Sequence, residues 1–255
     1  MAQSHNSLSN DCQNPVAELS SLERAAFVAQ ANGRMNDSLM FLSNASREPG
    51  SLNSPLAQAR IESEIGDIFL SKGEWEQAYQ HKKRAFDAFQ AGGIFIEVRR
   101  TALSLTTVLL ERKQFNDASR YLDIARYAPV ASKCLDDDDR ATLSSLSSSE
   151  DQHAGALNAA VTDSRNALEY WSLAHGANHP FTGWGHLLLA DAYANAGRSK
   201  EALSEYRLAV AILGGSLPKS DKHYLTAVRE YGRELQKSGD ELKTKNAWDD
   251  TSLRP

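Results

Sequence analysis

The sequence predicts an all-α protein built from about six consecutive antiparallel helical hairpins, and three observations lead to this prediction. First, alanines recur in one register, since Ala78, Ala118, Ala160 and Ala202 are separated by 40, 42 and 42 residues. Second, a glycine stands five residues before most of these alanines, where a helical hairpin needs its turn. Third, no stretch sustains the period-2 alternation that is typical of strands.

The register divides the chain into six repeats of one helical hairpin each. The repeats begin near Leu19, Ala59, Arg99, Ala141, Gly183 and Leu225. Their turn positions are Gly33, Gly73, Lys113, Gly155, Gly197 and Gly239, so Lys113 is the one departure from glycine. The eighth position is always small: Ala26, Gly66, Thr106, Ser148, Ala190 and Gly232. Small side chains at fixed positions allow the two helices of a hairpin to cross closely.

The prolines give an independent indication of the same boundaries. Pro15 and Pro55 each lie four residues before a repeat begins, and Pro180 and Pro218 lie between repeats. Pro49 and Pro129 each stand at about the thirty-first position of their repeats, so none of these prolines interrupts a proposed helix. Because proline blocks hydrogen bonding inside a helix, this distribution favours the proposed helices.

The fourth repeat has the weakest pattern. Its first helix offers only Leu143 and Leu146 as large apolar residues, so we expect this helix to be short, frayed or displaced. At the ends of the chain, we expect a disordered polar segment over residues 1–15, helical repeats over 16–246 and a tail over 247–255.

Composition narrows the function classes. The 255 residues carry 28 basic and 33 acidic side chains, which gives a net charge of −5. A protein that binds nucleic acid is expected to have an excess of basic residues, so we expect no nucleic-acid partner. Neither a signal peptide nor a membrane-spanning run is visible, so we expect a cytoplasmic protein with no membrane partner. Cys12 and Cys134 are too few for a disulfide framework, and we expect Cys134 to be a spare thiol.

The segment LADAYANAGRSKEALSEYRLAVAIL, from Leu189 to Leu213, resembles the tetratricopeptide repeat. The 42-residue period and the segment HGANHPFTGW are similar to the longer repeat of the kinesin-light-chain type. The resemblance covers roughly residues 17–245 and implies an α-solenoid wound as a right-handed superhelix. It also implies that the first helix of each repeat lines a concave groove.

The resemblance assigns groove positions to particular residues of this chain. The resulting partner-binding candidates are Arg60, Asp67, Arg100, Thr107, Trp184, Leu187, Asp191, Asn195, Arg229 and Arg233. Such a surface could hold an extended or helical peptide, with guanidinium groups pairing to carboxylates and an indole filling a pocket. Trp184 has an alternative interpretation as a packing residue between repeats. Asp191 stands where the family usually has asparagine, so the family's cargo preference does not transfer directly.

The candidates for chemistry each have a simpler interpretation. His175 and His179 have a metal-ligand spacing but lack further ligands, and we expect them to be structural. The acidic run 136–139 is expected to supply negative charge at a helix N-terminus. The basic run 81–84 is expected to point in several directions.

No catalytic, metal or cofactor motif is present, and we expect none of these sites. The sequence therefore predicts a non-enzymatic scaffold that binds a peptide segment of another protein. The alternative is a peptide- or metabolite-responsive regulatory sensor, and an exposed end face leaves a homo-oligomer open.

Overall fold

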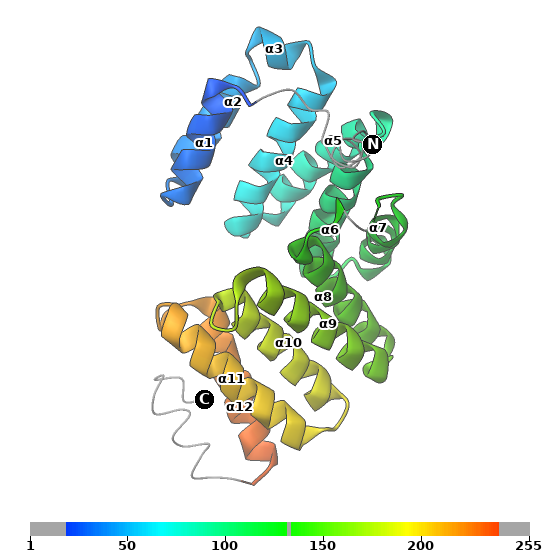
Figure 1. The fold of residues 1–255 in the computed structure, drawn as a ribbon, viewed down its shortest axis with the longest axis vertical. Helices are drawn as coiled ribbons and strands as arrows, with labels where there is room; N and C mark the ends of the chain where they lie inside the picture. Colours follow the sequence, from blue (N-terminus) through cyan, green and yellow to red (C-terminus); the bar gives the residue numbers. More distant parts are fainter. Residues whose placement is uncertain (1–18, 132–133, 240–255) are drawn as a thin grey trace, which may run out of the picture. The chain divides into compact units, whose positions relative to one another are not determined.

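The structure is a computed structural model that describes residues 19–131 and 134–239 (Figure 1). Every secondary-structure element with bounds within these residues is an α-helix, so the predicted all-α fold class is confirmed. The chain forms two compact bodies, an N-terminal body (1–134) and a C-terminal body (135–255).

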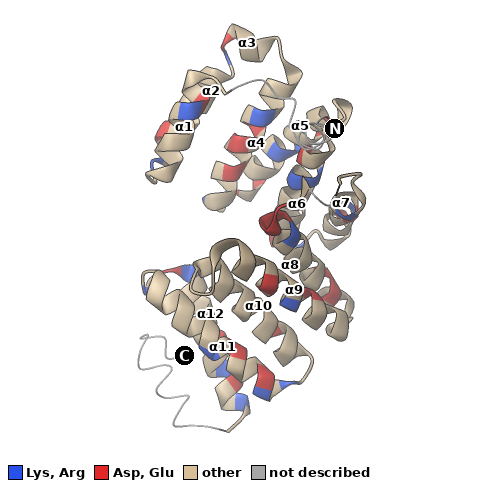
Figure 2. Cartoon of the chain, in the orientation of Figure 1, with Lys and Arg blue, Asp and Glu red and all other residues tan. Residues whose placement is uncertain are grey.

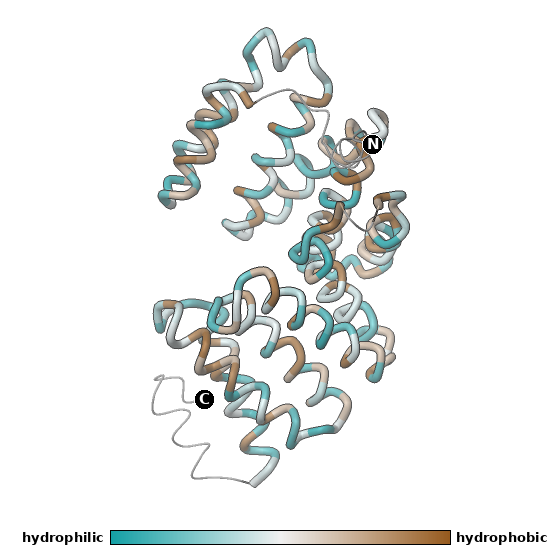
Figure 3. The backbone as a smooth tube through the Cα atoms, in the orientation of Figure 1, coloured by the Kyte–Doolittle hydropathy of each residue, from teal (hydrophilic) through white to brown (hydrophobic). Residues whose placement is uncertain are grey.

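The helices pack as sequential hairpins within each body, which is the packing of a tetratricopeptide-like α-solenoid. The N-terminal body contains α1 (Ser21–Ala31), α2 (Met35–Ala45), α3 (Pro49–Leu52), α4 (Pro55–Ser71), α5 (Trp75–Ala91), α6 (Phe95–Glu111) and α7 (Phe115–Tyr127). The C-terminal body contains α8 (Asp137–Ala154), α9 (Leu157–His175), α10 (Pro180–Asn195), α11 (Ser199–Ser216) and α12 (Lys222–Lys237). Hydrophobic and hydrophilic residues are mixed along each helix, as a helix with one buried face requires (Figure 3).

The predicted hairpin turns all adopt the left-handed backbone conformation. The glycines at these positions have φ between 70° and 77°: Gly33, Gly73, Gly155, Gly197 and Gly239. Lys113 has a φ of 58°, and within the described residues it is the one residue other than glycine whose φ is positive. The turn geometry is therefore retained where glycine is missing, at the steric cost that a Cβ atom adds in this region.

The alanines of the register lie where paired helices cross. Ala78, Ala118, Ala160 and Ala202 are at most 1% exposed. Ser148 at the small eighth position is also buried, and its hydroxyl donates to the backbone oxygen of Ala160 at 3.1 Å. Small residues thus allow the close approach of the helices, and a hydroxyl at the crossing is satisfied by the backbone of the opposite helix.

Helix α8 corrects one prediction from the sequence. It runs for 18 residues, so the expectation of a short or frayed helix is wrong. The Asp136 side chain caps it by accepting from the backbone N–H of Asp139 at 2.7 Å. Its buried face contains Ser148, whose hydroxyl lies 2.7 Å from that of Ser164 on α9. The helix is therefore held by a cap and by buried hydrogen bonds rather than by a row of large apolar residues.

The prolines confirm the helix boundaries. Pro49, Pro55 and Pro180 are the first residues of α3, α4 and α10. Proline suits this position because the first N–H of a helix has no intrahelical partner. Pro129 and Pro218 lie between helices.

Some expectations concern residues outside the described part. The N-terminal segment 1–15 and the tail 247–255 both lie there. Cys134 is disulfide-bonded, so the expectation of a spare thiol is wrong. The sequence has one other cysteine, Cys12, which lies outside the described residues.

Among the described helices, none is long and apolar enough to cross a membrane.

Candidate functional site

In the N-terminal body, the predicted groove residues are held by neighbouring side chains. Arg60 on α4 forms a 2.7 Å ion pair with Glu23 of α1. Asp67, also on α4, pairs at 2.7 Å with the buried Lys82 of α5. These two predicted residues therefore connect α4 to its neighbours, and Asp67 keeps about half of its side chain exposed.

The two candidates on α6 make short-range contacts. Arg100 lies 3.5 Å from Glu97 one turn earlier, and 42% of its side chain is exposed. The Thr107 hydroxyl donates to the backbone oxygen of Leu103 at 3.2 Å. Both residues are partly exposed.

In the C-terminal body, α10 carries four of the predicted residues. Leu187 is only 4% exposed and belongs to the hydrophobic core, so the exposed position expected for it is not observed. Asn195 is exposed, and its side-chain amide donates to Gln152 of α8 at 2.6 Å. Trp184 is 40% exposed and also stacks on Trp171 at 5.5 Å, so it both packs between helices and presents a surface.

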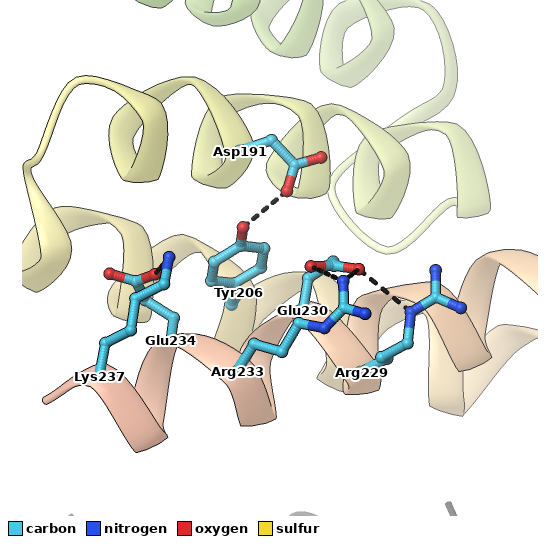
Figure 4. Close-up of polar contacts among 7 residues, drawn as sticks. All are labelled: Asp191, Tyr206, Arg229, Glu230, Arg233, Glu234 and Lys237. Atoms are coloured by element: carbon cyan, nitrogen blue, oxygen red, sulfur yellow. Dashed lines mark hydrogen bonds and ion pairs between the residues drawn. The ribbon is translucent and has the colours of Figure 1, made fainter. Parts of the chain in front are cut away.

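Asp191, the fourth residue, is a carboxyl group in an unusual environment (Figure 4). Its Oδ1 accepts a 2.6 Å hydrogen bond from the Tyr206 hydroxyl of α11. Its second oxygen, Oδ2, has no hydrogen bond or ion pair among the described residues, and Asp191 as a whole is partly exposed. Burial raises the pKa of Asp191 to about 6, the Tyr206 hydrogen bond opposes the rise, and the charge of Glu230 adds to it.

Helix α12 borders Asp191 with a row of ion pairs. Glu230 accepts from Arg229 at 3.1 Å and from Arg233 at 2.9 Å, so that one carboxylate binds both arginines (Figure 4). About half of each arginine side chain stays exposed. One turn further, Glu234 pairs with Lys237 at 2.8 Å. The arginines of this helix therefore neutralise Glu230 and still offer donors to solvent.

The two histidines with a metal-ligand spacing have structural roles. His175 ends α9, and its Nε2 lies 2.7 Å from Asp138 Oδ1. His179 caps α10 by accepting from the backbone N–H of Phe181 at 3.3 Å. In the described residues, no group of three or more histidine, cysteine, aspartate or glutamate side chains is placed to hold a metal ion.

The two charge runs behave as the sequence indicates. The acidic residues cap α8 and occupy its first turn (Figure 2). In the basic run, Lys82 is buried against Asp67, whereas Arg84 on the same helix pairs with Glu62 at 2.9 Å. The run is therefore not a single basic patch.

Two residues of the site were missed by reasoning from the sequence. Tyr206 was visible as the aromatic of the repeat pattern, but that pattern indicates packing and not the direction of a hydroxyl. Glu230 follows Arg229 and precedes Arg233 by three positions, and this helical spacing was the signal that could have revealed the ion-pair row.

Comparison with known proteins identifies the repeat. Residues 138–214, which contain nearly all of α8, all of α9 and α10 and most of α11, match the tetratricopeptide repeat family model. This part of the chain is tetratricopeptide repeat sequence. No curated protein matches the chain.

Solved structures resemble the chain at the level of the fold. BtubC (BKLC) from P. vanneervenii is 15% identical with a TM-score of 0.66, over 92% of this chain and 91% of BtubC. A Rap protein, solved in complex with Competence and Sporulation Factor, is 15% identical with a TM-score of 0.67, over 92% of this chain and 66% of Rap. A putative kinesin light chain from Podospora anserina matches at 15% identity over 91% and 92% of the two chains, with a TM-score of 0.40. This chain thus spans nearly all of BtubC and about two thirds of Rap.

Proposed function

We propose that this protein is a non-enzymatic interaction scaffold that binds a peptide segment of another protein on α10 and α12 of the C-terminal body. The observation that carries the proposal is the unpaired Oδ2 of Asp191 on α10 together with the half-exposed side chains of Arg229 and Arg233 on α12, the helix that packs against α10. A surface with acceptors and donors side by side can pair with the backbone and the charged side chains of a peptide.

Two exposed groups at the ends of α10 extend this surface. Trp184 offers 40% of its area for apolar contact, and Asn195 offers an amide at the other end of the helix. Aromatic and arginine side chains contribute a large share of the binding energy in many interfaces. The Rap structure with a bound factor supports the proposal, because its fold is similar. On α4 and α6, Arg60, Asp67, Arg100 and Thr107 are proposed as a second contact surface.

The proposal is tested by affinity capture from a native lysate followed by mass spectrometry. Wild-type protein is compared with Trp184→Ala/Arg233→Glu, and Arg207→Glu on the exposed part of α11 is the matched charge-reversal control. We expect a partner that wild type and the control retain and that the double variant loses. A partner retained by all three proteins would contradict the assignment to α10 and α12.

The sensor alternative gives a different result in the same experiments. A peptide- or metabolite-responsive regulator would capture no partner protein but would gain thermal stability from a small ligand. A thermal-shift screen with peptides and metabolites therefore separates the two functions.

A further inference from the structure

We propose that Oδ2 of Asp191 binds a positively charged nitrogen of the partner peptide, carried by a lysine or arginine side chain. The inference rests on the proposed function and names the chemistry that this surface recognises. Asp191 stands where the repeat family usually has asparagine. A carboxylate at this position favours a cation as the binding group, whereas an amide favours a neutral polar group.

The geometry leaves one oxygen of Asp191 available. Tyr206 donates to Oδ1 at 2.6 Å and so fixes the orientation of the carboxylate. Oδ2 points away from Tyr206 (Figure 4) and has no hydrogen bond or ion pair within the described part of the chain. A carboxylate oxygen with an open lone pair accepts most strongly from a charged N–H donor.

The neighbouring cations are engaged elsewhere. Arg229 and Arg233 both pair with Glu230. Lys237 pairs with Glu234. On α9, Arg165 donates to the hydroxyl of Tyr193 at 2.9 Å. The charge of Asp191 is therefore not neutralised by these side chains, and a cation supplied by the peptide would neutralise it.

Electrostatics favours a basic group and disfavours an acidic one at this position. Asp191 is largely removed from water, and Glu230 of α12 is the carboxylate that acts on it. Tyr206 of α11 faces Asp191 as a neutral donor, because burial and the nearby carboxylates of Asp191, Glu230 and Glu234 raise its pKa. A ligand cation would interact strongly with Asp191 because the surroundings screen less than bulk water does.

Binding of a cation is also coupled to the proton of Asp191. The cation requires the ionised carboxylate, whereas burial raises the pKa of this group to about 6. Affinity for a basic peptide should therefore decrease as the pH falls below about 6 and become constant above it. This pH profile distinguishes Asp191 from an ordinary surface carboxylate.

The experiment selects binders from a phage-displayed library of random short peptides on wild-type protein, on Asp191→Asn and on Glu201→Gln. The amide introduced by Asp191→Asn keeps an oxygen that can accept from Tyr206, so the fold should persist, and circular dichroism checks it. Glu201→Gln removes the same charge from an exposed position on α11. We expect lysine or arginine to be enriched at one position with wild type and with the control, and not with Asp191→Asn.

A measurement on the ligand side is independent of any protein variant. Replacing the enriched lysine by norleucine, or the enriched arginine by citrulline, should weaken binding to wild type about tenfold or more, and should change binding to Asp191→Asn much less.

The outcomes separate the inference from the proposed function. Enriched peptides without a basic position, or with the same basic preference on Asp191→Asn, would overturn the inference and leave peptide binding supported. A library that yields no peptide binder would contradict both.

Discussion

The raised pKa of Asp191 predicts how the stability of the folded protein depends on pH. Its pKa is about 6 in the folded protein and 3.8 when unperturbed. The folded state therefore holds the proton more tightly than the unfolded state does. The contribution of Asp191 to stability is most favourable below pH 3.8, and it is lost as the pH rises from 3.8 to about 6. Asp191→Asn carries no such charge, so the variant should become progressively more stable than wild type over that range.

The magnitude follows from the two pKa values. A difference of about 2 in pKa corresponds to a full effect of about 3 kcal/mol in the free energy of unfolding. The part that lies between pH 5 and pH 7.5 is about 1.4 kcal/mol by the same relation. Intrinsic differences between a carboxylic acid and an amide do not depend on pH, so the change with pH isolates the cost of burying the charge.

The assay is urea unfolding followed by circular dichroism at pH 5, 6 and 7.5 for both proteins. A carboxyl-carbon NMR titration of Asp191 gives the folded pKa directly. The reasoning would be refuted if the stability difference between variant and wild type stayed constant with pH, or if the NMR pKa fell near 4.

Three further substitutions test how the hairpins are held together, each by urea unfolding at pH 7.5. Lys113→Gly should raise the free energy of unfolding by about 0.5–1 kcal/mol, because glycine adopts a positive φ without steric cost. Gly73→Ala should lower the free energy of unfolding by about 1 kcal/mol, because it adds a Cβ atom at a positive φ. An unchanged free energy of unfolding for Lys113→Gly would contradict this account of the turn. Arg60→Ala should cost about 2 kcal/mol, since it leaves the buried Glu23 without its cation, and an unchanged midpoint would show that the pair contributes nothing. Ser148→Ala should cost about 1–2 kcal/mol because it removes the buried hydrogen bonds of this hydroxyl to Ser164 and to the backbone oxygen of Ala160, whereas a gain in stability would mean that apolar packing outweighs these hydrogen bonds.

The features of the fold that depend on local geometry could be predicted from the sequence. The turn at Lys113 was identified by position alone, because a hairpin of fixed length needs its left-handed residue at one place whatever the side chain. Helix α8 could not be predicted with the same success. Its buried face uses Ser148 and Ser164, and residue hydrophobicity does not reveal that two hydroxyls on different helices satisfy each other.

The candidate site shows the same division. The repeat register placed Asp191 on the correct helix, but its environment depends on Tyr206 and Glu230, which come from two other helices. Leu187 was assigned to the surface by its position in the repeat, although the packing of α10 against its neighbours places this side chain in the core. A position within a repeat defines the helix and its approximate face, whereas burial depends on three-dimensional packing.

The packing of each body has a consequence for how this chain reaches its structure. The helix pairs with substantial contact are neighbours in sequence or next but one. Such short-range connectivity gives a low contact order, which is typical of chains that fold in microseconds to milliseconds. Within each body, folding can begin at one hairpin and propagate to the next, since the described helices pack against their neighbours in sequence. On the ribosome, a repeat can therefore assemble on the previous repeat of the same body as soon as its second helix has emerged.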